Sequence, residues 1–580
     1  MVSAVIYSFD NFSIDTSRRV LLKGDESITL TPRIFDTLAH LVQHHDRVVT
    51  KEELLRSIWP NVFVEENNLT QSVSTLRRIL GERKGANRFI VTVAGHGYRF
   101  AAAVKVSGAP TQASESTTTI AVLPFKPLVE KDRDAALELG MADALIMQLS
   151  ALQTIVRPLT SVRRFTSLDQ DAQNAGRELG VESILDGSIQ RASDRIRVSA
   201  RLTNVADGKT LWTGTFDEKF TDVFTVQDAI SERVASALKL RLNKGGLSKR
   251  FTDSTRAYEL YVQGRYHWNR LVPSEVRKGI EFYEQALEID PEYALALTGL
   301  AVANISLTIS ADGPPAELFP KAKTAALKAL SIDESLADAH AYLAFVKFWF
   351  DWDWPGAESE LKRALVLNPN SAEAHRGYGI LLSQLRHFEE AIVHGERARQ
   401  LDPLALITRA NEAMFLYHAG RYEEAQQRLT STLELEPNFW VALLALGKLY
   451  AQQKKYAEAV EALTKAKQFC GGSTQPLAML GFVHGLAGDR AQAQSVLKEL
   501  QALADARYVP PYNFSIVYYG LRDYKKTFTW LSRAYDARDP LLAAFINCEP
   551  FWEPLRSDKR FLSLLQRMNL FSEDYVGDRE

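Results

Sequence analysis

The hydrophobic pattern is clearest in the C-terminal half of the chain, where small and apolar residues recur with a period of 34. Three series keep this step: Ala357, Ala391, Ala425, Ala459 and Ala493; Leu361, Gly395, Leu429, Leu463 and Leu497; and Pro369, Pro403 and Pro437. Small residues let two helices approach closely, leucine fills the space between them, and proline ends the second helix of a pair. The period predicts an all-α solenoid of about eight helical hairpins over residues 255–540, followed by a cap at 541–580.

The pattern changes between residues 119 and 245. An apolar run at 119–125, helical spacing over 135–151, a strand-like stretch at 154–158 and a helix at 170–180 indicate an α/β domain. Three segments then alternate apolar and polar residues, as expected of a strand meander that precedes a helix at 222–242: 183–191, 196–204 and 210–218. A Ser, Thr, Gly and Pro-rich stretch at 106–118 predicts a linker before this domain.

The first 105 residues combine strand and helix signals in the order of an α+β winged helix. Strand-like segments at 7–14 and 19–23 precede a helix that Thr31 caps and Pro32 begins. Thr50 and Glu53 form a capping box for a second helix, and a third runs from about residue 67 to Leu80. Two further strands, at 88–92 and 98–102, flank Gly95-His96-Gly97 and predict a hairpin.

The third helix offers the candidate chemistry. Its apolar stripe, Leu69, Val73, Leu76 and Leu80, predicts the buried face. Short hydrogen-bonding side chains on the other faces suit base edges, and basic side chains suit phosphates. The candidate DNA-binding residues are Asn68, Thr70, Gln71, Ser74, Thr75, Arg77 and Arg78 on the helix, with His96 and Arg99 at the hairpin.

Charge is distributed unevenly along the chain. The formal net charge is −2, yet residues 67–105 hold seven Lys or Arg against one acid, Glu82. This local excess favours a nucleic-acid partner. Two cysteines, no basic and apolar leader, and no apolar run near 18 residues predict a cytoplasmic protein with no membrane partner.

Four ordered blocks in the first domain resemble OmpR-type winged helices, particularly those of CadC- and ToxR-like regulators: residues 30–38, 48–55, 73–81 and 95–100. The resemblance implies that helix 67–80 enters the major groove and that the 93–98 hairpin contacts the minor groove. Ala94 departs from the basic residue that relatives often carry there. The middle segment resembles the TolB N-terminal-like domain, and residues 442–467 resemble the tetratricopeptide repeat.

The sequence gives no support for catalysis. We find no metal-ligand spacing, P-loop, nucleophile elbow or dinucleotide-binding glycine pattern, so no enzyme activity, cofactor or metal is expected. Trp349, Trp352 and Trp354, which alternate with Asp351 and Asp353, are interpreted as a poorly matched repeat loop rather than a metal or ligand pocket.

The leading hypothesis is a transcriptional regulator that binds double-stranded DNA, with a protein or peptide partner on the concave face of the repeats. A homodimer on tandem half-sites is expected from geometry. The alternative is a cytoplasmic tetratricopeptide-repeat scaffold or signalling adaptor whose winged helix binds protein. A third possibility is a signalling protein whose α/β domain binds a small molecule.

Overall fold

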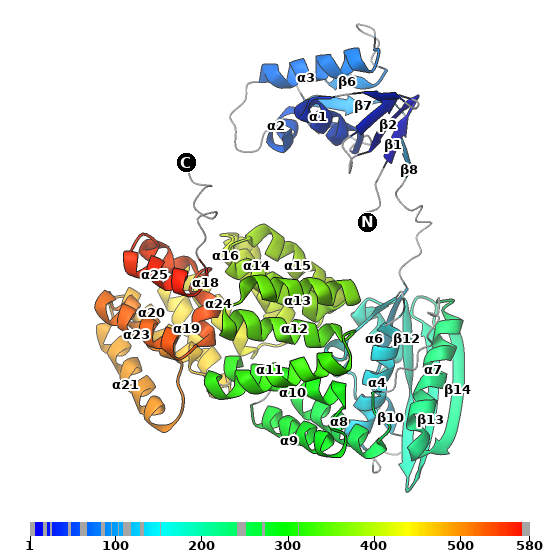
Figure 1. Cartoon of the computed structure of the whole chain (residues 1–580), viewed down its shortest axis with the longest axis vertical. Coiled ribbons are helices and arrows are strands. Elements are labelled where there is room, and N and C mark those ends of the chain that lie inside the picture. Colours follow the sequence, from blue (N-terminus) through cyan, green and yellow to red (C-terminus); the bar gives the residue numbers. More distant parts are fainter. Residues whose placement is uncertain are drawn as a thin grey trace. The chain divides into compact units, whose positions relative to one another are not determined.

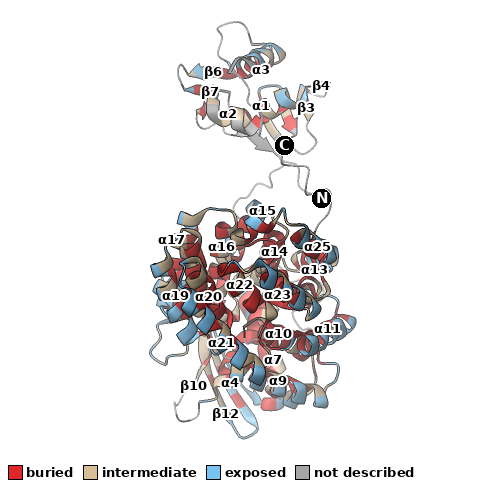
Figure 2. Cartoon of the chain, turned by 90° about the vertical axis from the view of Figure 1, so that its left-hand side faces the viewer, coloured by how far each residue is buried: buried red, intermediate tan, exposed pale blue. Residues whose placement is uncertain are grey.

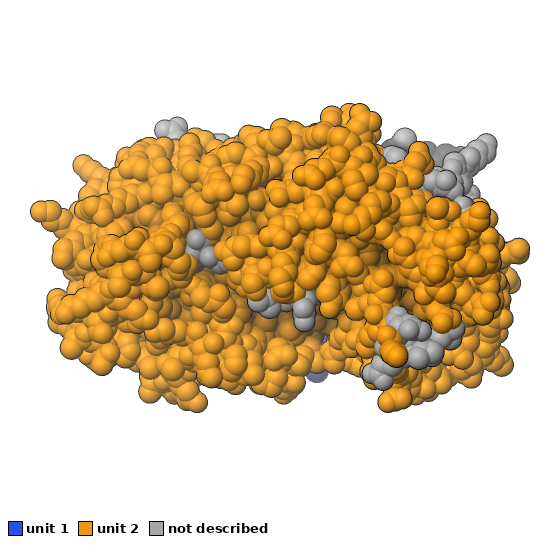
Figure 3. Space-filling model, turned by 90° about the horizontal axis from the view of Figure 1, so that it is seen from below, with its two compact units in different colours: residues 1–116 blue, residues 117–580 orange. Residues whose placement is uncertain are grey.

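The structure is a computed structural model (Figure 1), and it describes residues 6–15, 20–23, 26–28, 30–43, 48–58, 66–82, 88–93, 96–102, 104–107, 118–127, 131, 133–150, 152, 154–240, 251–269, 273–310 and 313–570. The chain divides into two compact units, residues 1–116 and 117–580, which Figure 3 colours separately. Each unit is described by itself.

Within its described residues, unit 1 contains two antiparallel sheets and three helices. The first sheet has the strand order β4-β3-β2-β1-β8 and the second has the order β5-β7-β6. Their bounds are β1 (Ile6–Phe9), β2 (Phe12–Asp15), β3 (Val20–Lys23), β4 (Glu26–Ile28), β5 (Val49–Thr50), β6 (Ile90–Val93), β7 (Gly97–Phe100) and β8 (Lys105–Ser107). The helices are α1 (Pro32–Gln43), α2 (Lys51–Ile58) and α3 (Glu66–Ile79). The expected winged-helix order is confirmed.

Two details of unit 1 differ from the sequence prediction. The single strand expected at 7–14 is a hairpin, because the chain turns at Asp10, whose φ is 51°. Aspartate tolerates this left-handed conformation better than most residues do. Lys105–Ser107 pairs with β1, so the first residues assigned to the linker belong to a strand.

The capping and core predictions for the helices agree with the structure. The amide of Glu53 donates to Thr50 Oγ1 over 3.1 Å, as a capping box requires. Gly81, at φ 73°, follows α3. The core gathers the stripe of α3 with apolar residues of α1, α2 and both sheets, among them Phe9, Leu38, Leu54, Phe89 and Phe100.

Gly97 marks the closest backbone approach in the hairpin region. It pairs with Thr50, and a Cβ at this position would lie 2.0 Å from the carbonyl oxygen of Val49. We expect Gly97→Ala to lower the stability of unit 1 by about 2 kcal/mol, because β5 and β7 must separate. Gly81→Ala is the matched control: no atom lies within 4 Å of its Cβ position, so only backbone strain of about 1 kcal/mol remains. Hydrogen exchange of the β5 and β7 amides in the full chain measures both variants, and equal losses would contradict the steric explanation.

The first part of unit 2 is the expected α/β arrangement around a mixed sheet of order β11-β9-β12-β13-β14, with β10 paired to β12. Strands β9, β10, β11 and β12 pair in parallel, whereas β12, β13 and β14 form the predicted antiparallel meander. The strands are β9 (Thr119–Val122), β10 (Lys126–Pro127), β11 (Ile155–Val156), β12 (Ser183–Ala192), β13 (Arg195–Asn204) and β14 (Thr210–Lys219). The helices are α4 (Ala135–Ser150), α5 (Leu159–Val162), α6 (Ala172–Leu179), the 3-10 helix η2 (Phe220–Asp222) and α7 (Val223–Ala237). Its resemblance to the TolB N-terminal-like domain stays a prediction.

Sixteen helices follow, and successive helices pair into eight hairpins within the described part of unit 2. Their bounds are α8 (Thr255–Trp268), α9 (Pro273–Ile289), α10 (Ala294–Ser310), α11 (Pro315–Ile332), α12 (Ala337–Val346), α13 (Trp354–Leu367), α14 (Ala372–Gln384), α15 (Phe388–Leu401), α16 (Leu406–His418), α17 (Tyr422–Leu435), α18 (Trp440–Gln452), α19 (Tyr456–Phe469), α20 (Gln475–Leu486), α21 (Arg490–Ala506), α22 (Pro511–Gly520) and α23 (Tyr524–Asp536). The periodic alanines are fully buried, and a Cβ on Gly447 would lie 2.5 Å from Leu463. The 34-residue period therefore records where paired helices touch.

The first helices of successive hairpins also contact one another from α10 to α22 and form a continuous row, which we call the inner helices (α10, α12, α14, α16, α18, α20 and α22). Figure 2 shows buried residues concentrated on helices of this row, such as α14 and α20. The partner that the sequence predicts on the concave face of the repeats stays a prediction.

The middle domain is continuous with the repeats. Arg265 on α8 forms an ion pair with Asp143 on α4, with Nη2 and Oδ1 2.6 Å apart. Arg157, which follows β11, donates to the carbonyl oxygens of Gln400 and Leu401 over 2.7 and 2.9 Å. The repeats therefore touch the middle domain both at their start and near Leu401.

The tryptophan-rich segment is helical rather than a loop. Lys347–Asp351 forms the π-helix η3, and the chain leaves it through Trp352 at φ 60°. Trp352 and Trp354 are buried in the core of the repeats. Asp351 pairs with Lys323, and Asp353 accepts the amide of Gly356 as the N-cap of α13. Both carboxylates therefore have structural partners.

The last segment departs most from the expected end cap. It comprises α24 (Pro540–Phe545), the 3-10 helix η4 (Pro550–Leu555) and α25 (Lys559–Arg567). Helix α25 packs on α23, but α24 contacts η3, α10 and α14, far back along the solenoid. The indole N–H of Trp354 donates to the Met568 carbonyl over 2.7 Å. The segment thus crosses the row of inner helices as well as covering the final hairpin.

Candidate nucleic-acid interface and inner face of the repeats

Helix α3 presents one polar face to solvent. Leu69, Val73, Leu76 and Leu80 are buried, and Thr70, Gln71, Ser74 and Arg78 are exposed. The four exposed positions fall within about 100° of the helix circumference at 3.6 residues per turn. Thr75 is half-buried at the edge of this face, and the side chain of Asn68 lies outside the described residues. Short polar side chains followed by an exposed arginine suit base edges and a flanking phosphate.

Arg77 has a different environment from Arg78. Its Nη2 donates to the Ile90 carbonyl and to Thr92 Oγ1, both over 2.8 Å, and its Nε reaches the same carbonyl at 3.2 Å. Ile90 and Thr92 belong to β6 of the hairpin. The expectation of a phosphate-binding Arg77 is therefore revised: its guanidinium ties α3 to the hairpin.

Glu82 completes this connection. Its side chain is 1% exposed, and its Oε2 lies 4.0 Å from Arg77 Nε. Its Oε1 accepts the backbone amide of Phe89 over 3.3 Å. A buried carboxylate needs such partners, because an unpaired charge is costly to keep out of water. The sequence analysis counted Glu82 only as the single acid in a basic stretch. Gly81 ends the helix, so Glu82 lies beyond the exposed helix face, and this position was the available signal.

The hairpin supplies the remaining candidates. His96 and Arg99 are exposed, and the amide of Lys51 donates to the His96 carbonyl over 3.3 Å. Arg88 at its base pairs with Asp10 over 2.8 Å, which links the hairpin to the first sheet. Tyr98 and Phe100 are buried, as predicted for alternate strand residues that face a core. Ala94 lies outside the described residues.

On the repeats, six inner helices or the turns that follow them contact residues 539–553, which we call the C-terminal segment. Asn547 donates from Nδ2 to the Gln384 carbonyl over 2.8 Å, and Arg386 Nη1 donates to the Asn547 carbonyl over 3.0 Å. Further hydrogen bonds join α22 to the segment: Tyr512 N to Asp539 Oδ2 over 2.9 Å, Trp552 Nε1 to Tyr512 OH over 3.1 Å, and Tyr519 OH to the Phe551 carbonyl over 2.8 Å.

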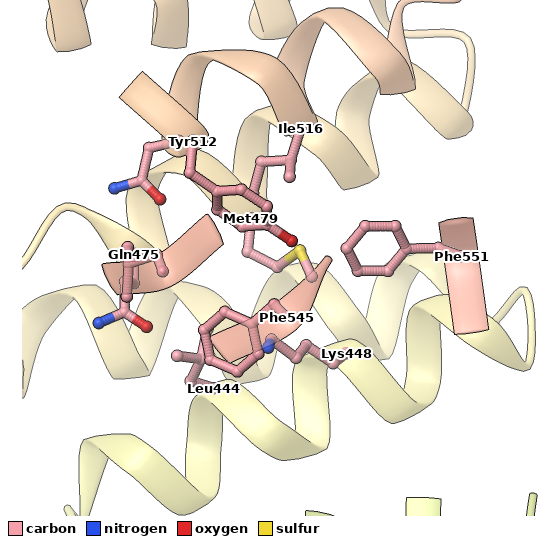
Figure 4. Close-up of a pocket in the computed structure, with 10 residues that line it drawn as sticks. Leu444, Lys448, Gln475, Met479, Tyr512, Ile516, Phe545 and Phe551 are labelled. Atoms are coloured by element: carbon pink, nitrogen blue, oxygen red, sulfur yellow. The ribbon is translucent and has the colours of Figure 1, made fainter. Parts of the chain in front are cut away.

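A buried ion pair lies at the centre of this contact. Lys448 on α18 binds Glu549, and their side chains are 8% and 0% exposed. Lys448 Nζ also lies 3.8 Å from the centre of the Phe545 ring. A small pocket remains beside the pair, between α18, α20, α22 and the segment (Figure 4). Its lining is mainly apolar and includes Leu444, Met479, Ile516, Phe545 and Phe551.

His418 adds a pH-sensitive group at this inner face. Burial, and then the charges of Lys448 and Arg386, lower the pKa of His418 to about 3. Its Nδ1 is 2.8 Å from Ser383 Oγ. In the unfolded chain His418 binds a proton near pH 6.5, whereas in the folded chain it stays neutral down to a much lower pH. The free energy of unfolding therefore falls as the pH drops below about 6.5.

We expect this histidine to remove about 2 kcal/mol of stability between pH 8 and pH 5. Urea unfolding of the full chain across this pH range, followed by helical circular dichroism, measures the loss. His418→Asn keeps a polar side chain without the titration and should flatten the pH dependence by that amount. An unchanged slope in this variant would refute the assignment.

Comparisons with known proteins agree with this geometry. Residues 25–100 match the family model "Transcriptional regulatory protein, C terminal", and residues 352–405 and 416–468 match tetratricopeptide-repeat models. The chain therefore carries an OmpR/PhoB-type winged-helix DNA-binding domain and tetratricopeptide repeats.

Two similar proteins are transcriptional regulators by name. The chain is 24% identical to the transcriptional regulator HilA of Salmonella paratyphi A over 475 residues, which cover 80% of this chain and 83% of HilA. It is 34% identical to the phosphate regulon transcriptional regulatory protein PhoB of Klebsiella pneumoniae over 98 residues, 17% of this chain and 42% of PhoB. These matches support a DNA-binding transcriptional regulator with a tetratricopeptide-repeat region.

A third similar protein has a different name. The putative adenylate cyclase 3 of Rhizobium meliloti is 28% identical over 252 residues, which cover 42% of each chain. The chain thus spans less than half of that protein, and the activity in its name is not carried over. Among the described residues of both units, no helix is long and apolar enough to cross a membrane.

Proposed function

We propose that this chain regulates transcription by placing α3 in the major groove of promoter DNA. The exposed polar face of α3, which ends in Arg78, carries the proposal. Thr70, Gln71, Ser74 and Thr75, with Asn68 at the start of the helix, read base edges, and Arg78 neutralises a phosphate. His96 and Arg99 contact the backbone or minor groove beside the hairpin, and Arg77 is a positioning residue.

We also propose that two copies bind together on tandem half-sites about one helical turn apart. A single winged helix covers one short stretch of major groove, so a second copy on the same face of the duplex supplies the additional affinity and specificity. A regulator that binds chromosomal DNA must be in the same compartment as the chromosome. This requirement supports a cytoplasmic location for the proposed regulator.

The repeats are proposed to bind a protein or peptide partner along their inner helices, and the chain is proposed to act without catalysis of its own. The alternative, a scaffold whose winged helix binds protein, is not favoured, because the family model and the regulator relatives both concern DNA-binding proteins.

Genome occupancy and transcript levels, measured together in cells, test the regulator function. We expect the full chain to occupy discrete sites near genes whose transcripts change, and Arg78→Ala to lose both effects. Gln71→Ala should shift or weaken the preferred sequence while the protein level stays constant. Occupancy that is unaffected by both substitutions would contradict base and phosphate contacts by α3.

A further inference from the structure

The inner face of the later repeats already holds an occupant, which is part of the chain itself. Residues 539–553 contact α10, α14, α16, α18, α20 and α22 or the turns that follow them. A peptide partner would need the same surface. Access to it therefore depends on whether the C-terminal segment stays in place.

The segment interacts with the repeats as a peptide ligand would. Leu541 and Phe545, four residues apart on α24, line the pocket between the inner helices. Figure 4 shows the Phe545 ring there. Asn547 exchanges hydrogen bonds with the backbone of α14 and with Arg386, and Glu549 supplies the carboxylate for Lys448. Apolar anchors combined with a few placed polar groups are typical of peptide recognition by a helical groove.

The contact between the C-terminal segment and the inner helices leaves some buried polar atoms without a hydrogen bond. Two buried side-chain atoms there lack a hydrogen-bond partner within the described structure: Gln384 Oε1 and His418 Nε2. Native interiors contain few such atoms, and each one weakens the contact that buries it. Their position in this contact, beside an incompletely filled pocket, marks it as a place for local opening.

We propose that the C-terminal segment is a displaceable occupant of the inner face, and that the partner is a peptide of the same chemistry. That peptide presents two apolar residues four apart and, four residues after the second, a carboxylate for Lys448. A peptide without the acid leaves the Lys448 ammonium buried and unpaired, so the carboxylate sets the selectivity. Binding of the partner then requires that residues 539–553 leave the inner helices.

The two cysteines of the chain provide the test. Cys548 lies within the segment and is buried, and burial raises the pKa of its thiol. Cys470 is also buried but follows α19, where its thiol contacts the carbonyls of Lys467 and Ser473. Full chains with Cys470→Ser or Cys548→Ser each keep one thiol, so maleimide labelling reports release of the segment in one and opening elsewhere in the other.

The probe is a synthetic peptide of residues 539–556 with serine at position 548. We expect it to raise the labelling rate of Cys548 at least tenfold, saturably, while Cys470 labelling is unchanged. The same peptide with Glu549→Gln should have no effect. Hydrogen exchange of residues 540–553 in the unmodified chain, with and without peptide, gives the same readout without cysteine substitutions.

Three outcomes would overturn the proposal: no acceleration by the peptide, equal acceleration of both thiols, or equal action of the Glu549→Gln peptide. The first two would make the segment an integral part of the repeat core, and the third would remove the carboxylate from recognition. The inference rests on the proposed partner binding by the inner helices. None of these results depends on DNA binding by unit 1, so the proposed regulator function stands or falls separately.

Discussion

Arg77→Ala should unfold or loosen unit 1, whereas Arg78→Ala should leave its stability unchanged and weaken only DNA binding. Removing Arg77 deletes three hydrogen bonds to β6 and leaves the buried Glu82 carboxylate without its cation. We expect a stability loss of about 3 kcal/mol. Arg78 is exposed, so its removal should change stability by less than about 0.5 kcal/mol.

The DNA affinity of the variants should also distinguish the role of Arg78 from that of Arg77. If Arg78 neutralises one phosphate, Arg78→Ala should cost about 1 to 2 kcal/mol of affinity on every sequence and reduce the slope of log affinity against log salt by about 1. Arg77→Lys is the matched control, because a lysine keeps the charge but cannot form the forked contacts to Ile90 and Thr92. Full stability in Arg77→Lys, or a loss of stability in Arg78→Ala, would contradict the assigned roles.

Lys448→Met should destabilise the repeats by about 3 to 5 kcal/mol, because Glu549 would remain buried without a counter-charge. Glu549→Gln should produce a loss of similar size for the reciprocal reason. Urea unfolding of the full chain, followed by helical circular dichroism, measures both. The effect is specific to a buried pair, since exposed pairs such as Lys321–Glu317 contribute under about 1 kcal/mol.

The double variant Lys448→Met with Glu549→Gln is the control for this prediction. Because no charge is then left buried, we expect it to recover most of the stability that either single variant loses. Lys321→Met with Glu317→Gln should show no comparable coupling. Additive losses at 448 and 549 would mean that the two side chains do not stabilise each other across this contact.

The features that could be predicted from the sequence are those that follow from regular residue spacing. The 34-residue steps predicted the paired helices because Ala357 and its equivalents must be small wherever two helices meet. The capping box at Thr50 and the buried stripe of α3 followed from spacing in the same way. These signals are local, so a single sequence carries them.

The errors and omissions involve contacts between distant residues. The ties from Arg77 to β6 and from Glu82 to Phe89 depend on how the hairpin folds back on α3, which composition does not encode. The position of residues 539–553 depends on the curvature of the whole solenoid, and only the break in the period and the apolar run at 541–546 hinted at it. The turn at Asp10 was missed although the apolar positions change phase across it, from Tyr7 and Phe9 to Phe12 and Ile14.

Selection from fragmented genomic DNA by the full chain, across a salt series, tests the central claim most directly. We predict that sequencing the retained fragments yields a short motif repeated about one helical turn apart, that affinity falls steeply with salt, and that Gln71→Ala relaxes the motif. Retention without any enriched sequence, or a salt-independent affinity, by a chain shown to be folded would contradict a sequence-specific DNA-binding role for α3.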